Sequence, residues 1–411
     1  MTSIGASTPD RGYALRIALA LVVAGLVVNG LIVRLWLGGN GRILFYETDR
    51  LADFVKHTMS FPGGALAPSF YPELIAHFQS DIEIFARVHG HFHNMPETVL
   101  LTLAVRPLFS LIDPIVLYMI FASLCVLIWA SVCHRHADAE ARPYALGLAL
   151  ANYPLLLMLD RGNLFSAITA ICLAVALLRK RQDWLATMLI AVAVNIRPNV
   201  AVIVLPLLAW DRATFAFVAR TFIVGVVLGF GSLAIDNVIY PAYTLQSWLR
   251  GLQLYNDTYT LGRFGTEYGS SLWGALRHVL PVTGRAVVLC MLAGLLPLVL
   301  AWLWRNRLSY AASCFLAMAA CALSTAVFGD YHLLIFLVPL LILRREDPAF
   351  WPILLGACWV LTPKNYTPND VLSWQVFLNP AGTVLAVLGI AQAYRNRVYG
   401  ISTPHTVEGQ S

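Results

Sequence analysis

Three carboxylates follow the first long apolar segment of the chain, within Glu47-Thr48-Asp49-Arg50-Leu51-Ala52-Asp53. Asp49 and Asp53 have i,i+4 spacing, so they share one face if this segment is helical. A carboxylate held beside apolar surface can act as a general base, which makes both residues candidate catalytic groups. A solvated helix start, with Asp49 near the N-cap, explains the same residues. Residue chemistry alone leaves both interpretations open.

Two arginines interrupt otherwise apolar sequence at positions with the composition of tight turns. The two segments are Asp160-Arg161-Gly162-Asn163 and Asn195-Ile196-Arg197-Pro198-Asn199. A turn explains Gly162 at the bend and Asn163 as the cap of the next helix, and Pro198 can begin a returning helix. Neither turn requires an arginine. Because guanidinium groups in such positions commonly pair with carboxylate or phosphate, Arg161 and Arg197 are candidate ligands of such an anionic group.

A third polar group, Asp330-Tyr331-His332, separates two apolar segments in the last third of the chain. A lone histidine there is usually an interface residue, but the predicted topology puts it on the same side as the other groups, so His332 is a further catalytic candidate. The region 236–284 is dense in aromatic residues, which suits either a membrane-interface belt or stacking against sugar rings. The candidate substrate contacts are Asn163, Asn199, Asp330, Tyr255 and Tyr268.

The sequence carries no clear signature of a metal or nucleotide site. Its seven cysteines lie in apolar segments or at the end of one, and none is paired at metal-ligand spacing. No glycine-rich phosphate loop is present either. We therefore expect neither a metal nor a cofactor, and we interpret the cysteines as small core residues.

The elements that must position these residues are membrane helices. Of the 411 residues, 59% are hydrophobic and 12% are charged, whereas a soluble globular protein has about 25% charged residues. Apolar segments recur along almost the whole length, which predicts an all-α polytopic membrane protein with one domain over residues 1–400 and a flexible cytoplasmic tail over 401–411. The net charge is +6, and the basic residues lie in short loops between apolar segments. They therefore indicate orientation in the membrane rather than nucleic-acid binding.

About twelve transmembrane helices are predicted. They cover residues 17–37, 114–132, 144–159, 164–178, 184–194, 200–210, 217–235, 286–304, 311–328, 333–343, 351–361 and 383–393. The first is interpreted as an uncleaved signal anchor, and Pro96 to Leu111 as an interfacial helix that does not cross. Lys and Arg clusters then face one side at every turn, which places both termini in the cytoplasm and the long loops 38–94 and 236–284 outside. A single kinked helix over 184–210 would invert everything downstream, so the positive-inside rule favours a hairpin with its tip at Arg197.

Several of these segments are short for a membrane span. About 13 residues of helix reach roughly 20 Å, whereas the hydrocarbon core is about 30 Å thick. Either the helices extend with polar residues or their tips lie below the membrane surface. In both cases Arg161 and Arg197 lie in a hydrated recess lined by protein rather than in lipid.

Taken in order, these segments resemble the GT-C glycosyltransferases, and most closely glycosyltransferase family 87, which includes actinobacterial polyprenyl-phosphate-mannose-dependent mannosyltransferases and related arabinosyltransferases. The matching segments are Asp49 to Phe54, Arg161-Gly162-Asn163-Leu164-Phe165, Asp183 to Leu207 with Asn195-Ile196-Arg197-Pro198, and Asp330-Tyr331-His332-Leu333-Leu334. The family pattern usually has Gln before Asn in the second segment and Lys-Pro in the third, where this chain has Gly162-Asn163 and Arg197-Pro198. The stretch from Tyr71 to Pro107 is similar to the family's Tyr-Pro-Pro segment in altered form.

The resemblance implies a GT-C-type bundle whose extracytoplasmic loops carry the site, in the cytoplasmic membrane of a bacterium. Such enzymes take a sugar from a polyprenyl phosphate, with mannose favoured here, and pass it with inversion to a hydroxyl of a glycolipid or glycan acceptor outside the membrane. An aspartate in the first outer loop acts as the base, and no metal is expected. Arg161 and Arg197 are then the expected ligands of the donor phosphate. By position Asp49 is the first choice for this base. Asp53 is the close alternative, because Asp53-Phe54 resembles the family's Asp-Phe pair.

Two other functions stay open. An O-antigen-type polymerase or ligase uses arginines in outer loops and no essential aspartate. A lipid or solute transporter can use Arg161 and Arg197 to bind a substrate in transit, but it should show repeat symmetry with paired broken helices. The sequence predicts two adjacent hairpins with arginine at the tip and no matching pair in its last third.

Overall fold

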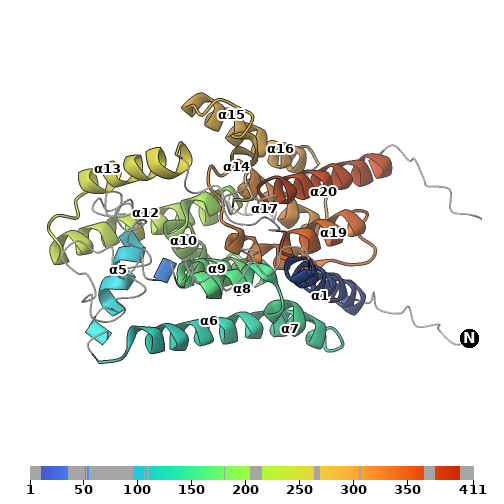
Figure 1. The fold of residues 1–411 in the computed structure, drawn as a ribbon, viewed down its shortest axis with the longest axis horizontal. Coiled ribbons are helices and arrows are strands. Elements are labelled where there is room, and N and C mark those ends of the chain that lie inside the picture. Colours follow the sequence, from blue (N-terminus) through green and yellow to red (C-terminus); the bar gives the residue numbers. More distant parts are fainter. Residues whose placement is uncertain are drawn as a thin grey trace, which may run out of the picture.

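The structure is a computed structural model that describes residues 11–35, 51, 53–54, 96–105, 107–108, 111–179, 181–203, 215–262, 269–304, 307–364 and 375–398. Within these ranges the chain is helical and contains no strand, apart from one isolated bridge between Gly269 and Gly329. The predicted all-α class is therefore confirmed (Figure 1). Almost all of the predicted outer loop 38–94, and the whole tail 401–411, lie outside the described residues.

The helices of the first half precede the second long polar region. They are α1 (Arg11–Leu35), α5 (Pro96–Val105), α6 (Pro114–His136), α7 (Arg142–Leu150), α8 (Tyr153–Arg161), α9 (Leu164–Arg179), α10 (Trp184–Ile196), the 3₁₀ turn η2 (Pro198–Val200) and α12 (Phe215–Ile239). In Figure 1, α6 and α12 both run along the long axis of the molecule. Helix α1 packs against α7 and against α19 (Phe350–Leu361) of the second half, so the two halves form one body.

The second half is built mostly from shorter helices. They are α13 (Leu245–Tyr255), the π-helical turn η3 (Asn256–Thr260), α14 (Leu272–Leu276), α15 (Gly284–Gly294), α16 (Leu296–Leu303), α17 (Tyr310–Ser324), the 3₁₀ helix η4 (Asp330–Phe336), α18 (Leu337–Ile342), α19 and α20 (Gln375–Val398). Helices α13 and α14 lie within 236–284, so this region is not an open loop. A capping box in which Thr244 and Ser247 exchange hydrogen bonds begins α13.

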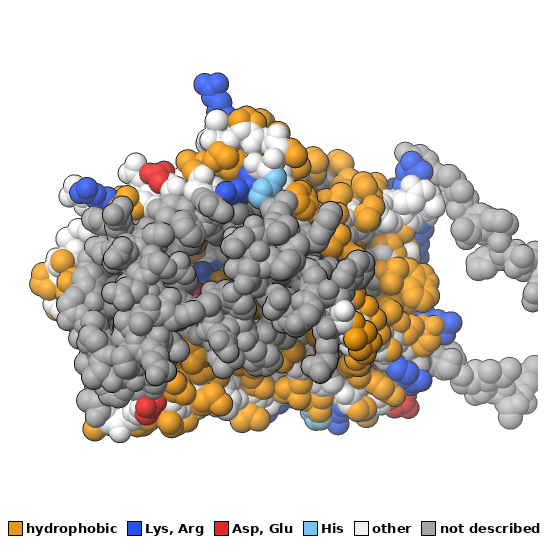
Figure 2. Space-filling view, viewed as in Figure 1, with side chains coloured by type: hydrophobic (Ala, Val, Ile, Leu, Met, Phe, Trp, Pro, Cys, Tyr) orange, Lys and Arg blue, Asp and Glu red, His pale blue; other side chains and the backbone are white. Residues whose placement is uncertain are grey.

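Five helical segments in the described part of the chain are long and apolar enough to cross a membrane. They are Gly12–Ile32, Ile115–His136, Ala216–Ile239, Gly284–Leu303 and Val376–Arg397. Their outward faces carry large exposed apolar side chains, such as Phe222 and Val227 on α12, and Figure 2 shows hydrophobic surface over much of the visible described area. The chain is therefore a membrane protein. The remaining apolar helices have 10–17 residues, and the count of twelve spans stays a prediction.

Two predicted spans contain a break. The segment 144–159 is divided into α7 and α8 because the Asn152 side chain accepts a hydrogen bond from the Leu155 amide and donates to the Leu148 carbonyl, while Pro154 has no amide hydrogen to continue α7. The segment 286–304 is divided at Leu295, ahead of Pro297, into α15 and α16.

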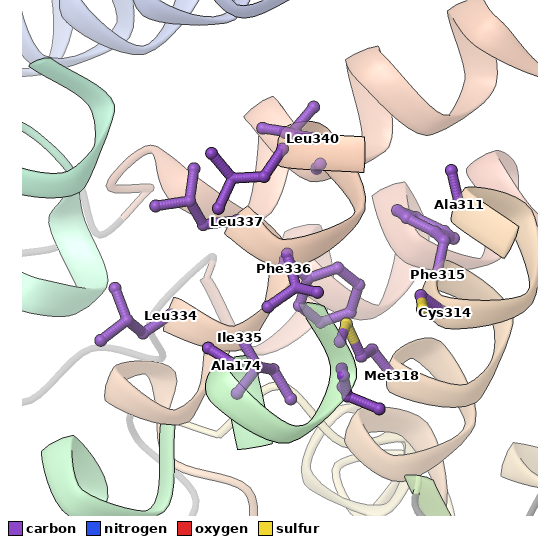
Figure 3. Packing of buried hydrophobic residues seen from close by; sticks show 14 of the residues in the cluster. Ala174, Ala311, Cys314, Phe315, Met318, Leu334, Ile335, Phe336, Leu337 and Leu340 are labelled. Atoms are coloured by element: carbon purple, nitrogen blue, oxygen red, sulfur yellow. The ribbon is translucent and has the colours of Figure 1, made fainter. Parts of the chain in front are cut away.

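The main core surrounds α17, of which every residue after Tyr310 is buried. Phe315 of α17 packs edge-on against Phe336 of η4, with ring centroids 5.3 Å apart (Figure 3). Figure 3 also shows Ala174 of α9 and Leu337 and Leu340 of α18 around the same cluster. All seven cysteines are free and six of them are buried, which confirms their interpretation as core residues. This packing holds η4 from several sides.

Candidate functional site

The turn between α8 and α9 is the frame of the candidate site. Gly162 ends α8 in the left-handed conformation, with a φ of +74°, and its amide donates to the Leu159 carbonyl. The Asn163 side-chain oxygen then accepts hydrogen bonds from the amide and the hydroxyl of Ser166, at 3.1 and 2.7 Å, and so caps α9. The predicted roles of Gly162 and Asn163 in a turn are confirmed.

The segment around Asp53 is fastened to this turn. The backbone amide of Leu51 donates to the Asp160 carbonyl at 2.7 Å, and the side-chain nitrogen Nδ2 of Asn163 donates to Asp53 Oδ2 at 2.8 Å. A Cβ atom at Gly162 would lie 2.6 Å from the Cβ of Phe54, so only glycine lets the segment approach this closely. The Phe54 ring also packs against Tyr118 of α6, with centroids 5.2 Å apart.

Arg197 reaches the same asparagine from the end of α10. It follows the last helical residue with extended backbone, and its Nη2 lies 3.4 Å from Asn163 Oδ1. Asn163 therefore connects a carboxylate on one side with a guanidinium on the other. Among the described residues, Asp53 accepts the hydrogen bond from Asn163 and forms no ion pair.

Arg161 lies in the last turn of α8 and is 7% exposed, with its Nε 3.9 Å from Asp160 Oδ2. The phenol of Tyr331 lies within the electrostatic reach of Arg161, Arg197 and Asp53. The next residue, His332, lies within the electrostatic reach of Arg197, and its ring meets that of Tyr331 edge-on at 4.5 Å.

Tyr255, at the end of α13, is near the same groups. Burial raises its pKa, the charge of Arg197 opposes this rise, and the charge of Asp53 adds to it. The structure thus brings together six of the residues singled out from the sequence: Asp53, Arg161, Asn163, Arg197, Tyr255 and His332.

Two further predicted residues that the structure describes, Asn199 and Asp330, have other partners. Asn199 is half-buried in η2, and its carbonyl accepts a hydrogen bond from the Cys321 thiol of α17. Asp330 lies in a separate buried cluster, described next. Asp49 and Tyr268 lie outside the described residues, so their predicted roles stay predictions.

Asp330 is the centre of that cluster and has 0% exposure. Its carboxylate accepts hydrogen bonds from Ser270 Oγ at 2.6 Å, from Asn379 Nδ2 at 3.3 Å and from the Tyr153 hydroxyl at 3.4 Å. Lys364 is 3% exposed, and burial lowers its pKa to about 7 while the charge of Asp330 opposes this shift. Asp330 was predicted to contact substrate, but its oxygens face these protein partners instead.

Sequence reasoning missed two residues of this region. Tyr331 stands between two residues that were singled out, and no rule for a single tyrosine in an apolar segment marks it. Lys364 did leave a signal, because a lysine directly after an apolar helix needs a counter-charge or exposure to water.

The two arginines are the cationic groups that the site offers to an anion. Among the described residues, no three His, Cys, Asp or Glu side chains gather in a way that suits a metal ion.

No protein-family model matches the chain, and comparisons with curated proteins and with solved structures give no significant match either. Its function must therefore be inferred from its own residues.

Proposed function

We propose that this protein is a membrane glycosyltransferase of the GT-C type, which moves a sugar from a polyprenyl phosphate to a hydroxyl of a glycolipid or glycan acceptor. The observation that supports this proposal is the arrangement Asp53–Asn163–Arg197, with Arg161 beside it. A carboxylate that forms no ion pair with any described residue lies close to two guanidinium groups inside an apolar helix bundle. This combination offers a base and an anion site together.

In the proposed reaction, Asp53 removes the proton of the acceptor hydroxyl as its oxygen attacks the anomeric carbon. The bond between that carbon and the donor phosphate oxygen breaks, and the configuration inverts. Negative charge grows on the departing polyprenyl phosphate, where Arg161 and Arg197 stabilise it. The proton ends on Asp53, and the electron pair of the broken bond ends on the phosphate.

Asn163 orients the base in this mechanism. Its hydrogen bond occupies Oδ2 of Asp53, and none of the described residues donates to Oδ1. The proposal therefore assigns Oδ1 as the oxygen that receives the acceptor proton. His332 and Tyr255 border the same space and serve as contacts to the sugar or the acceptor.

The donor and the location follow from the same proposal. Mannose is the favoured sugar, and the reaction takes place on the outer face of a bacterial cytoplasmic membrane, with both chain termini in the cytoplasm. The acidic loop after α1 supplies the base. Asp49 was the first choice from the sequence and lies outside the described residues, so the proposal takes Asp53 as the base and keeps Asp49 as the alternative.

Transfer of radiolabel from polyprenyl-phosphate-mannose in membranes that contain the protein tests the proposal. We expect Asp53→Asn to lower turnover by roughly 10²–10⁴-fold at equal protein abundance, because general-base catalysis supplies about this much. Asp257→Asn, a change at an exposed residue of η3, is the matched control and should keep normal turnover.

The outcomes separate the alternatives. If Asp49→Asn abolishes transfer and Asp53→Asn does not, the base is Asp49 and the mechanism stands. If both variants keep normal turnover, the aspartate base is wrong and the polymerase or ligase alternative is favoured. If the unmodified protein transfers no lipid-linked sugar at all, the proposed function itself fails.

A further inference from the structure

Five buried side chains form a cluster next to Tyr331 and His332 of the candidate site. They are Asp330, Ser270, Asn379, Tyr153 and Lys364, and the group is here called the Asp330 cluster. Its members come from five parts of the chain: η4, the segment before α14, α20, α8 and the segment after α19. Asn379 also donates to Ser270 Oγ at 3.0 Å, so the hydrogen bonds form a connected network.

Asp330 is the member on which the network depends. A carboxylate removed from water is stable only with several hydrogen bonds or an opposite charge. Asp330 has three donors and the buried charge of Lys364 nearby. Lys364 in turn donates to the carbonyls of Trp359 and Thr362 at the end of α19. Removing the carboxylate therefore leaves three buried donors without their common charged acceptor and Lys364 without a counter-charge that keeps its proton bound.

The backbone next to Asp330 is fixed in the same place. Gly329 pairs with Gly269 in the isolated bridge, and the Ser270 amide donates to the Phe328 carbonyl at 2.8 Å. The beginning of η4 is thus held by both its backbone and its first side chain.

The geometry of η4 links this anchor to the site. A 3₁₀ helix has 3.0 residues per turn, so consecutive side chains point about 120° apart. With Asp330 turned into the Asp330 cluster, the next two side chains must point elsewhere. They are Tyr331, which the charges of Asp53 and Arg197 reach, and His332, which the charge of Arg197 reaches.

We propose that Asp330 is a positioning residue, which fixes the first turn of η4 so that Tyr331 and His332 face Arg197, and which does not itself touch substrate. The catalytic consequence rests on the proposed function, but the ordering of η4 does not. This positioning role replaces the sequence-based prediction that Asp330 contacts substrate.

Hydrogen exchange measured by mass spectrometry on the full-length protein tests the ordering. In Asp330→Asn, amides of residues 330–337 should exchange about tenfold faster or more than in the unmodified protein, because the asparagine replaces one acceptor oxygen by an amide group and leaves buried donors without a partner. In Asp330→Asn/Asn379→Asp the carboxylate and the carboxamide exchange places across their hydrogen bond, so a charged acceptor is restored and protection of these amides should return. Asp347→Asn is the matched control: Asp347 is another buried aspartate, bonded to Ser309 and Tyr394, and its change should leave η4 unaffected.

Turnover on polyprenyl-phosphate-mannose tests the positioning role. Asp330→Asn should lower kcat about 100-fold, the cost of roughly 1 Å of misplacement, with little change in the KM of the donor. The double variant should regain kcat together with η4 protection. If it regains protection and stays inactive, Asp330 contacts substrate and the proposal is wrong. If Asp330→Asn exchanges like the unmodified protein, the anchor is wrong. If the unmodified protein transfers no sugar, the proposed function fails, and the exchange result still decides the anchor.

Discussion

Asn163 carries three contacts with one side chain. Its oxygen caps α9 through Ser166 and lies near Arg197, while its nitrogen donates to Asp53. A carboxamide is the side chain that offers an acceptor and a donor at this length, whereas an aspartate here would repel Asp53 and donate nothing. One residue thus joins a helix start, a candidate base and a candidate phosphate ligand.

Gly162→Ala tests how tightly this turn holds Asp53. An alanine at a φ of +74° costs about 1–2 kcal/mol, and its Cβ would lie 2.6 Å from Phe54 Cβ, so the segment carrying Asp53 must shift. We expect a modest loss of thermal stability and a fall of transfer activity of about 100-fold. Both are measured on purified protein.

Gly231→Ala is the control for that experiment. A Cβ atom added at Gly231, within α12, would have nothing within 4 Å, so the new methyl group meets no neighbour. The stability of this variant should be unchanged or slightly higher, since alanine favours a helix. Equal losses in the two variants would contradict the close approach at Gly162.

Lys364 makes stability depend on pH. Burial lowers the pKa of its folded form to about 7, whereas the unfolded chain keeps the ordinary value of 10.5. Between these values the unfolded chain binds more protons, so stability rises with pH by at most about 1.4 kcal/mol per unit. In Lys364→Met this contribution is absent. The stability of the unmodified protein relative to Lys364→Met should therefore rise from pH 7 to pH 9 in chemical denaturation.

Arg344→Met removes an exposed cation and is the matched control. The difference between the unmodified protein and Arg344→Met should stay constant over the same pH range. A constant difference for Lys364→Met as well would show that Lys364 is not buried as described.

At the scale of elements, the sequence predicted helix ends mainly through residues with strong preferences for capping positions and turns. The turn at Gly162 and Asn163 was predicted because both residues have strong local preferences. The break at Asn152 was missed, although an asparagine followed by Pro154 has the same composition as a helix start. Its apolar neighbours made the segment resemble one continuous span, so local capping overrode the hydropathy pattern.

Helix α15 offers a matched pair of glycines. A Cβ at Gly294 would lie 2.4 Å from the Ser324 amide nitrogen of α17, and backbone atoms cannot move aside. Gly284 has nothing within 4 Å. We expect Gly294→Ala to lower stability by about 1–3 kcal/mol through overpacking, and Gly284→Ala to have no such effect. Thermal unfolding in detergent measures both, and equal stability of the two variants would contradict the α15–α17 contact.

At the scale of the whole molecule, composition sufficed to predict a helical membrane protein, and charge and turn preferences sufficed to select most residues that converge near Asn163. The pairing of distant segments was not predictable in the same way. Asp330 was grouped with the site because it follows an apolar segment, but its burial depends on Ser270 and Asn379, which are far away in sequence. A hydropathy pattern contains no information about such partners.

The predicted orientation is testable at two exposed acidic residues. Asp257 and Glu346 are exposed in this structure, whereas the native cysteines are buried or half-buried and should react slowly. In the single variants Asp257→Cys and Glu346→Cys, a membrane-impermeant maleimide on intact cells should label position 257, and position 346 only after permeabilisation, because the positive-inside rule places Arg344 and Arg345 inside. Labelling of position 346 in intact cells would reverse the topology.

The shortness of α9 and α10 has a mechanical consequence. With 16 and 13 residues, they reach only about 24 and 20 Å, less than the thickness of an ordinary hydrocarbon layer. Lipids beside them must compress, at an elastic cost of fractions of a kcal/mol per Å of mismatch, or protein must cover the helix ends. Where the lipids compress, the headgroup plane dips toward the end of α10, where Arg197 lies and reaches Asn163 of the turn that follows Arg161. For a lipid-phosphate donor of the kind proposed, this deformation would bring the phosphate closer to the depth of the two guanidinium groups.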